Sequence, residues 1–315
     1  MRKTILSAIA LATAVLAPAV AQAAPLLKPF IMGSRVPGDA AAVATAAANA
    51  AQKLQAQGFQ VVGHYSPYTG TEIIIVTDDS LKKVAAATSF GAYGAAERVA
   101  VTAVGGEVQV SYTNPPYMAA AYRMNGDVSD VARRLAAALG NTGAFGAEGI
   151  SDEDLREYRY MFGMEEFSDP DLLATYGSQT EALAAIEKNL AAGVMGIRKV
   201  YRIDMPGKAE SVFGVSMSGA KAGGDQQDDR YLMSQIDFKD QRSTAHLPYE
   251  MVVSDGKVYA LSARFRIAID FPDLSMMGSH SFMSIMGAPD AIHAALAAAA
   301  GETWKKASTN SASNN

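Results

Sequence analysis

The sequence predicts an α+β protein of two tandem similar domains, each a mostly antiparallel sheet covered on one face by helices. Two observations support this prediction. One order of helix and strand signals occurs in both halves of the chain, and several strands pair as hairpins around tight turns. Antiparallel hairpins with few helices are typical of sheets covered on one face, whereas a parallel sheet needs a crossover after each strand.

The first copy of this order occupies the residues after 37. An Ala-rich stretch with apolar residues at helical spacing ends at Gly58, and glycine is common just past a helix end. Strand-like stretches separated by Gly-containing turns follow it. The expected elements are a helix over 43–54, strands over 59–65 and 73–76, a helix-like stretch over 80–88, a hairpin over 98–110 and a closing helix over 128–139.

The second copy begins after residue 176 and is more diverged. Its expected elements are a helix over 183–190, strands over 197–203 and 211–217, a hairpin over 248–260 and a closing helix over 288–300. Its differences from the first copy are a Gly- and Asp-rich loop over 220–229, an extra strand over 231–238 and an insertion-like stretch over 265–286. The shared order predicts a tandem duplication of one helix-strand-strand-hairpin-helix unit.

These elements divide the chain into five parts. The parts are a signal peptide over 1–23, a first α+β domain over 24–142, an interdomain segment over 143–178, a second α+β domain over 179–302 and a disordered tail over 303–315. A passive linker would be polar, but 158–167 is rich in aromatic residues and Met. We therefore expect the interdomain segment to pack across both domains.

The N-terminus predicts export. Arg2 and Lys3 precede an apolar stretch over 5–20, and Ala21-Gln22-Ala23 has the small-x-small form that a signal peptidase cuts. No cysteine near this site carries a lipid, and no later apolar run is long enough to cross a bilayer. We expect cleavage near Ala23, a periplasmic product and no transmembrane segment after cleavage.

Composition excludes several classes of function. The chain has a net charge of −5, and loss of Arg2 and Lys3 gives −5 − 2 = −7, so nucleic acid is not an expected partner. The absence of cysteine excludes disulfides, thiol catalysis and thiolate metal sites. With 49% hydrophobic residues, stability is expected to come from packed cores.

The first half also resembles a known family, the one called domain of unknown function 302. The residues that carry the resemblance are Gly58, 71–76, 98–101 and 106–115, with a hairpin that ends in Tyr112-Thr113-Asn114-Pro115. The family's usual Asn-Pro and Leu-Pro stretch is absent from the first half, although Leu247-Pro248 in the second half is similar to its Leu-Pro element. The match covers 38–140 well and 176–300 loosely. It implies the fold class and export, and it brings no reaction or ligand.

The first candidate site is a loop in the second half that combines thioether and imidazole side chains. Its residues are Met276, Met277, His280, Met283 and Met286. Thioether sulfur with one imidazole suits Cu(I), so copper is the one metal considered; no other cofactor is expected. The alternative is that these Met side chains fill irregular gaps in a core or an interface.

The second candidate is a pair of arginines. The stretch 257–271 alternates apolar and polar residues, which predicts a strand with Arg264 and Arg266 on one face. Two guanidinium groups placed in this way suit a carboxylate or a phosphate. The alternative is a solvated face whose charges pair with nearby acids.

The third candidate is the aromatic part of the interdomain segment, Tyr158, Tyr160 and Phe162. These side chains suit a surface for an apolar ligand or a protein partner. The alternative is that they fill the joint between the two domains.

No recognised catalytic motif accompanies these groups. In Gly214-Val215-Ser216-Met217-Ser218-Gly219 neither serine has the nucleophile-elbow spacing, and HExxH, P-loop and dinucleotide motifs are missing from the sequence. The leading hypothesis is a non-enzymatic periplasmic binding or accessory protein for a small ligand or partner, with its site near the interdomain joint or the 265–286 loop. An enzyme with an unfamiliar carboxylate and arginine site and a copper-binding protein are the alternatives.

Overall fold

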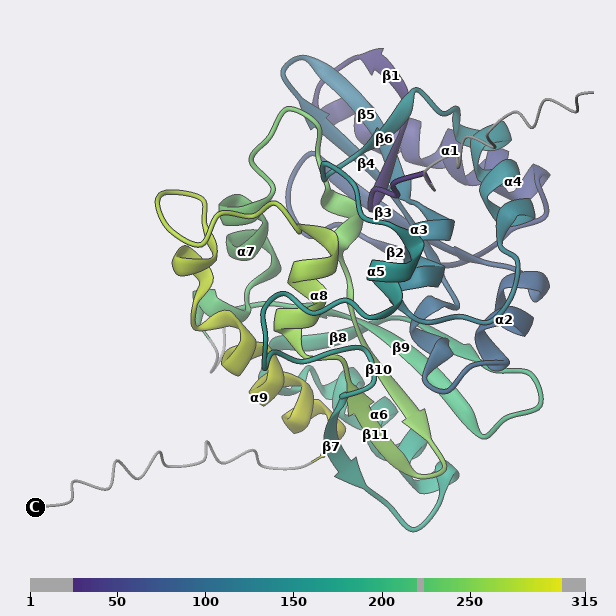
Figure 1. The fold of residues 1–315 in the computed structure, drawn as a ribbon, viewed down its shortest axis with the longest axis vertical. Helices are drawn as coiled ribbons and strands as arrows, with labels where there is room; N and C mark the ends of the chain where they lie inside the picture. The colour runs from purple at the N-terminus through teal and green to yellow at the C-terminus, as the bar shows by residue number, and fades with distance from the viewer. Residues whose placement is uncertain (1–24, 220–223, 302–315) are drawn as a thin grey trace, which may run out of the picture.

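The structure is a computed structural model that describes residues 25–219 and 224–301 (Figure 1). The expected signal peptide over 1–23, with its cleavage near Ala23, and the expected tail over 303–315 lie outside the described residues, as does part of the 220–229 loop. The α+β class with antiparallel sheets is confirmed, because the chain forms two antiparallel sheets accompanied by helices.

The first sheet has six strands in the order β2-β3-β4-β5-β1-β6. The strands are β1 (Phe30–Pro37), β2 (Gln60–Tyr65), β3 (Thr71–Thr77), β4 (Glu97–Val104), β5 (Glu107–Thr113) and β6 (Gly143–Phe145). The two hairpins follow the chain directly, and β1 adds antiparallel to β5. Strand β6 belongs to the interdomain segment, which therefore extends this sheet at one edge.

The second sheet has five strands in the order β7-β11-β10-β9-β8. The strands are β7 (Asp171–Thr175), β8 (Ile197–Asp204), β9 (Glu210–Met217), β10 (Tyr249–Ser254) and β11 (Lys257–Ala260). Strand β7 also comes from the interdomain segment, so this segment contributes one edge strand to each sheet.

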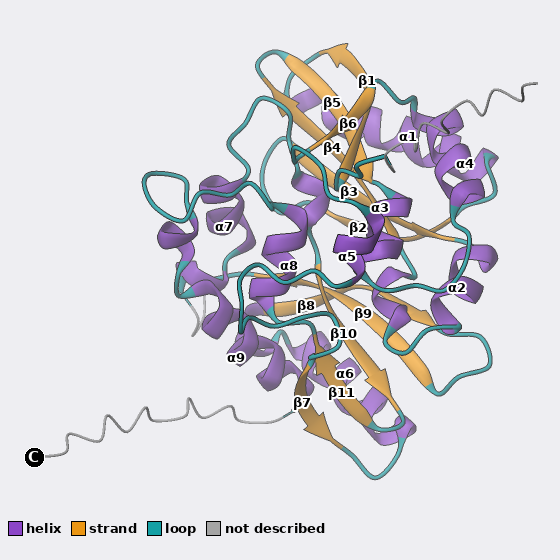
Figure 2. Ribbon diagram, viewed as in Figure 1, coloured by secondary structure: helices purple, strands orange, loops and turns teal. Residues whose placement is uncertain are grey.

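Helices cover one face of each sheet (Figure 2). The α-helices of the described residues are α1 (Val43–Ala56), α2 (Asp79–Ala86), α3 (Pro115–Ala121), α4 (Ser129–Leu139), α5 (Asp152–Arg156), α6 (Gln179–Ala192), α7 (Asp229–Ile236), α8 (Ala263–Asp270) and α9 (Ala288–Ala300). Short 3₁₀ turns are η1 (Ala40–Ala42), η2 (Gly91–Gly94), η3 (Val194–Gly196), η4 (Asp225–Gln227), η5 (Thr244–His246) and η6 (Phe282–Ile285). Helix α1 packs on β2, β3 and β4, and α6 packs on β8, β10 and β11.

The two halves have the same order of elements along the chain. Apart from β6, α5 and the 3₁₀ turns, each half runs strand, helix, hairpin, helix, hairpin and two helices. The strand orders β2-β3-β4-β5-β1 and β8-β9-β10-β11-β7 also correspond position by position.

The contacts between the halves are reciprocal. Turn η2 of the first half packs on β9 and β10, and turn η5 of the second half packs on β4 and β5. Strands β2 and β8, which occupy corresponding positions, contact each other. Such an exchange of equivalent contacts is the pattern of a two-fold interface.

The prediction of a strand over 231–238 is wrong, because these residues belong largely to α7. Asp228 caps this helix by accepting a hydrogen bond from the backbone N–H of Tyr231. The buried residues Leu232, Met233 and Ile236 have helical spacing. A cap followed by this spacing outweighs the strand propensity of the segment.

The prediction of one long strand over 257–271 is also wrong. Strand β11 ends at Ala260, and α8 begins at Ala263. Most of α8 is buried on all sides, its charged residues Arg266 and Asp270 included. The alternation of polar and apolar residues therefore did not mark one exposed face of a strand.

The most apolar helix of the described chain packs into the protein. The stretch Phe282–Ala300, formed by η6 and α9, is long and apolar enough to cross a membrane by length and composition. Its Ile292 and Leu296 are buried, and α9 contacts α6, α8 and β7. These contacts are those of a core helix.

A tight approach between β8 and β9 generates a test of the fold. A Cβ atom added at Gly214 would lie 1.9 Å from Cε1 of Tyr201, whose side chain is buried. We expect Gly214→Ala to lower the free energy of unfolding by about 1–3 kcal/mol, because the ring has no space to move into. Urea denaturation measures this change. Ser216→Ala, two residues along the same strand, should stay within about 0.5 kcal/mol of the parent, and equal effects of the two changes would contradict the packing.

Candidate functional site

The junction of the two halves contains a fully buried cluster of charged side chains, which we call the junction cluster and define as Arg98, Glu250, Arg266 and Asp270. Arg98 on β4 donates from Nη1 to Oε1 of Glu250 on β10 over 2.8 Å. Arg266 on α8 donates from Nε to the other oxygen of Glu250 over 3.2 Å, and from Nη1 to Asp270. Two guanidinium and two carboxylate groups thus balance, which buried charges require.

A histidine and a tyrosine extend the junction cluster. Burial lowers the pKa of His246 to about 4, against the opposing effect of Asp270, so the imidazole is neutral at neutral pH. Burial alone would raise the pKa of Asp270, but the charge of Arg266, the hydrogen bond from His246 and the charge of Arg98 hold it at about 2. His246 therefore donates from Nδ1 to ionised Asp270 over 2.7 Å and accepts from the Tyr249 hydroxyl at Nε2 over 3.0 Å.

The Asp270–His246–Tyr249 chain has the connectivity of a general-base relay but not the access. Each of the three residues is at most 2% exposed. None of them lines the three cavities described below. A base must reach a proton of its substrate, so this chain stabilises the junction and does not meet a substrate.

The junction cluster predicts a large cost for removing one charge. Arg98→Met leaves Glu250 with a single cationic partner, and we expect a loss of about 3–5 kcal/mol in the free energy of unfolding. Arg35→Met is the control, because Arg35 and Glu107 form an exposed pair at 4.0 Å; its expected cost is below about 1 kcal/mol.

The double variant Arg98→Met/Glu250→Gln removes one charge of each sign and leaves Arg266 paired with Asp270. We expect it to be more stable than Arg98→Met alone, which denaturant titration of the four proteins measures. A cost of Arg98→Met no larger than that of Arg35→Met would show that the junction does not depend on this pair.

A second buried contact joins the halves at β2 and α7. The hydroxyl of Tyr65 donates to Oδ2 of Asp229 over 2.5 Å, and the backbone N–H of Met217 donates to the same oxygen over 2.8 Å. Burial raises the pKa of Asp229 to about 7, although both hydrogen bonds oppose the rise. The folded protein therefore holds a proton on Asp229 that the unfolded chain releases near pH 4.

This difference predicts the sign of a pH effect. A carboxyl whose pKa is raised on folding adds stability below about pH 4, and that contribution is lost as the pH rises to about 7. We expect Asp229→Asn, which keeps an acceptor for Tyr65, to gain stability relative to the parent between pH 4 and 7 and not beyond. Urea midpoints across this range test the prediction, with exposed Asp79→Asn as the control. Parallel curves for the parent and Asp229→Asn would contradict it.

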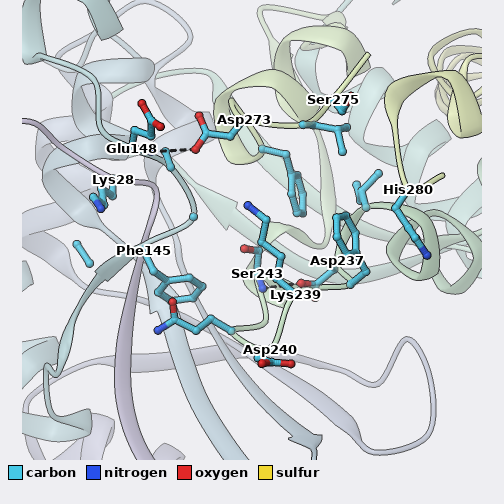
Figure 3. Close-up of a pocket in the computed structure, with 18 of the residues that line it drawn as sticks. Lys28, Phe145, Glu148, Asp237, Lys239, Asp240, Ser243, Asp273, Ser275 and His280 are labelled. Atoms are coloured by element: carbon cyan, nitrogen blue, oxygen red, sulfur yellow. Dashed lines mark hydrogen bonds between the residues drawn. The ribbon is translucent and has the colours of Figure 1, made fainter. Parts of the chain in front are cut away.

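A cavity of about 730 Å³ opens between the two halves, and we call it the junction cavity (Figure 3). Its walls come from four places: Lys28 ahead of β1, the residues at and after β6, the stretch from the end of α7 to 243, and the loop after α8. The lining residues are Lys28, Ala144, Phe145, Gly146, Ala147, Glu148, Ile236, Asp237, Phe238, Lys239, Asp240, Gln241, Ser243, Phe271, Asp273, Leu274, Ser275, Ser279 and His280. The volume is in the range of small-molecule sites.

Hydrogen bonds between the halves hold these walls. The backbone N–H of Glu148 donates to Oδ2 of Asp273 over 2.9 Å, which closes one side of the cavity (Figure 3). On the opposite wall, Gln109 of β5 donates from Nε2 to the carbonyl of Asp240 over 2.8 Å. The wall 237–243 is therefore fixed to the first sheet although it belongs to the second half.

The junction cavity carries unpaired charges of both signs. Lys28, Lys239, Glu148 and Asp240 form no ion pair with any residue that the structure describes. Figure 3 shows Lys28 and Glu148 on one side and His280 on the opposite side. Aromatic rings of the lining supply apolar surface between the charges. The arrangement suits a ligand that carries separated charges on a partly apolar body.

The arginine pair expected from the sequence is not on one face. Arg266 is 1% exposed within the junction cluster, whereas Arg264 is about 40% exposed at its side chain and pairs with Glu165 over 2.9 Å. The two arginines lie on helix α8 and not on a strand, so residues two apart point in different directions. The prediction that Arg264 and Arg266 lie on one face of a strand is therefore wrong.

The aromatic residues of the interdomain segment have three different environments. The hydroxyl of Tyr158 donates to the carbonyl of Ala268 over 3.3 Å. Tyr160 lines a small apolar cavity of about 30 Å³ beside Arg264. Phe162 is 99% exposed. The structure does not bring the three rings together at one site.

The Met and His residues of the 265–286 loop lie mostly at the surface. Met276, Met277, Met283 and Met286 are 40–71% exposed, and a backbone hydrogen bond of 3.2 Å joins Met283 to Met276. His280 donates from Nδ1 to the carbonyl of Gln235 over 3.2 Å and stacks on Phe238 at the junction cavity. Across residues 25–219 and 224–301, no group of three or more His, Cys, Asp and Glu is placed to hold a metal ion.

Sequence reasoning missed both the junction cluster and the charged lining of the cavity. Two signals were present. Arg98 interrupts an apolar strand, which is unusual unless a partner neutralises it, and Arg266 precedes Asp270 by four residues, the spacing of a helical pair. Lys239 and Asp240 gave no signal, because charged residues in a loop are ordinary.

Comparison with family models, curated proteins and solved structures gives no match to this chain.

Proposed function

We propose that this protein is a non-catalytic, exported binding protein that holds a small ligand with separated charges in the junction cavity. The observation that carries the proposal is the cavity of about 730 Å³ whose lysines and carboxylates have no ion-pair partner within the described chain. Charged groups that line a cavity without pairing keep their full capacity for a ligand of opposite charge.

The lining supports a zwitterionic ligand class. Lys28 and Lys239 suit an anionic group, and Glu148 and Asp240 suit a cationic one. The rings of the lining suit an apolar body between them. An amino acid or a short peptide has this combination of charges.

Binding is favoured over catalysis by the state of Asp237, a buried acid of the lining. Burial raises the pKa of Asp237 to about 6, opposed by hydrogen bonds from Thr244 and Ser243. Those bonds, each 2.7 Å long, occupy both carboxylate oxygens from the protein side. Asp237 is therefore engaged in holding the wall. An enzyme with a carboxylate and arginine site stays the alternative.

The shared element order, the corresponding strand orders and the reciprocal packing of η2 and η5 support an origin of the two halves as tandem similar domains. The copies are 24–142 and 179–302, and the second copy is completed by β7 of the interdomain segment. The residues that resemble domain of unknown function 302 lie in the first copy. Export rests on the N-terminal sequence over 1–23. Copper binding at the surface Met residues, or the docking of a periplasmic protein, are the remaining alternatives for this protein.

Native mass spectrometry of the protein purified from its own compartment tests the proposal. We expect a retained organic mass on the parent, and the Lys28→Met/Lys239→Met variant should lose it, because each lost charged contact weakens binding by about tenfold or more. Lys188→Met on α6 is the control, because this lysine is exposed and distant in the fold.

Thermal shift with the common amino acids provides the second readout, since a ligand at 100 times its Kd stabilises the fold by about 2.7 kcal/mol. Absence of any retained mass and of any shift, or equal retention by the double variant, would rule out the junction cavity as the binding site. Turnover of a bound compound would rule out the non-catalytic assignment.

A further inference from the structure

A second, smaller cavity lies on the other side of the 237–243 wall. It has a volume of about 290 Å³ and is lined by residues from both halves, which are Tyr68, Thr69, Arg230, Met233, Ser234, Asp237 and Arg242. Tyr68 and Thr69 come from the turn between β2 and β3, and Arg230 comes from the first turn of α7. Because one water molecule occupies about 30 Å³, the space accommodates a polyatomic ion together with several waters.

The two arginines of this cavity differ from most arginines of the protein in forming no ion pair within the described chain. Most described arginines lie within 4.0 Å of a carboxylate. Arg198, Arg230 and Arg242 have no such ion pair in the described chain, and two of these three line this one cavity. The acid in the lining, Asp237, forms no ion pair with either arginine in the described chain, and its carboxylate oxygens accept hydrogen bonds from Ser243 and Thr244. The charge of Arg242 nevertheless opposes the rise in the pKa of Asp237.

Arg242 is held in place by contacts that leave most of its donors free. Its Nη1 donates to the carbonyl of Asp237. Its backbone N–H donates to Oε1 of Gln109 over 3.3 Å, and its carbonyl accepts from the Ser111 hydroxyl over 3.1 Å. A guanidinium whose backbone is fixed on β5 in this way loses little freedom when it binds an anion.

We propose that this cavity is a binding site for a tetrahedral oxyanion, which is phosphate, sulfate or the phosphate group of a small ester. A guanidinium fork bonds two oxygens at once, so Arg230 and Arg242 together suit an anion with four oxygens better than a carboxylate with two. Tyr68 and Thr69 belong to the same lining, and hydroxyl groups are neutral donors for an oxyanion. This site is separate from the junction cavity and does not depend on the ligand proposed there.

Calorimetric titration of the full chain at constant ionic strength tests the site. The probes are inorganic phosphate, sulfate, glycerol phosphate and acetate. We expect saturable binding of phosphate and sulfate, and at least about tenfold weaker binding of acetate, because acetate engages only one fork. Tighter binding of glycerol phosphate than of phosphate would identify an ester as the ligand, and the reverse order would identify the free ion.

Four variants separate the site from general charge effects. Arg230→Gln and Arg242→Gln should each weaken phosphate binding by about tenfold or more. Arg198→Gln should leave it unchanged, because Arg198 also lacks an ion pair but lies outside the cavity. Arg242→Lys keeps the charge and removes the fork, so intermediate binding is expected if Arg242→Gln lowers the melting temperature. Arg230 is exposed, and its replacement should not affect folding.

The proposal is overturned by any of three results: no saturable binding of phosphate or sulfate at millimolar concentration, binding of acetate equal to that of phosphate, or equal losses in Arg198→Gln and Arg230→Gln. None of these results bears on ligand retention in the junction cavity, because the variants used there change Lys28 and Lys239.

Discussion

The pairing of Arg98 with Glu250 across the junction is the contact on which the arrangement of the two halves depends. Each side chain is at most 3% exposed, so neither charge is solvated by water in the folded protein. A junction shifted by one residue would leave a guanidinium and a carboxylate buried without partners, at a cost of several kcal/mol. Burial of apolar surface stabilises the association of the two halves. The pairing of charges in the junction cluster specifies how the two halves are aligned.

That alignment fixes the walls of the junction cavity. Arg266 donates from Nη2 to the carbonyl of His246, and the ring of His246 packs against Phe271 at 5.2 Å, edge to face. Phe271 is one of the residues that line the cavity. A chain of contacts therefore leads from the buried charges to the cavity wall, which is how a rigid core positions a binding surface on loops.

The 237–243 wall separates two cavities of different charge. Asp237 contributes to the lining of both, and its buried carboxyl group anchors the wall through Ser243 and Thr244. On one side lysines and carboxylates face each other across a partly apolar space, and on the other side two arginines lack acidic partners. Most residues of the wall line the junction cavity, whereas Arg242 lines only the smaller cavity, so one segment serves two chemistries.

The sequence by itself determined the α+β class, the hairpins and the helices α1, α4, α6 and α9, because these depend on local periodicity, turn residues and helix ends. It did not determine α7 and α8, since the environment of α8 buries residues on every side and removes the contrast between polar and apolar faces on which periodicity depends. The sites were decided only by tertiary structure. Arg98 and Glu250 are 152 residues apart in the chain, and the lining of each cavity comes from both halves. The spacing of such residues in the sequence does not tell how far apart they lie in space. That distance is set by the packing of the two sheets through the η2 and η5 turns.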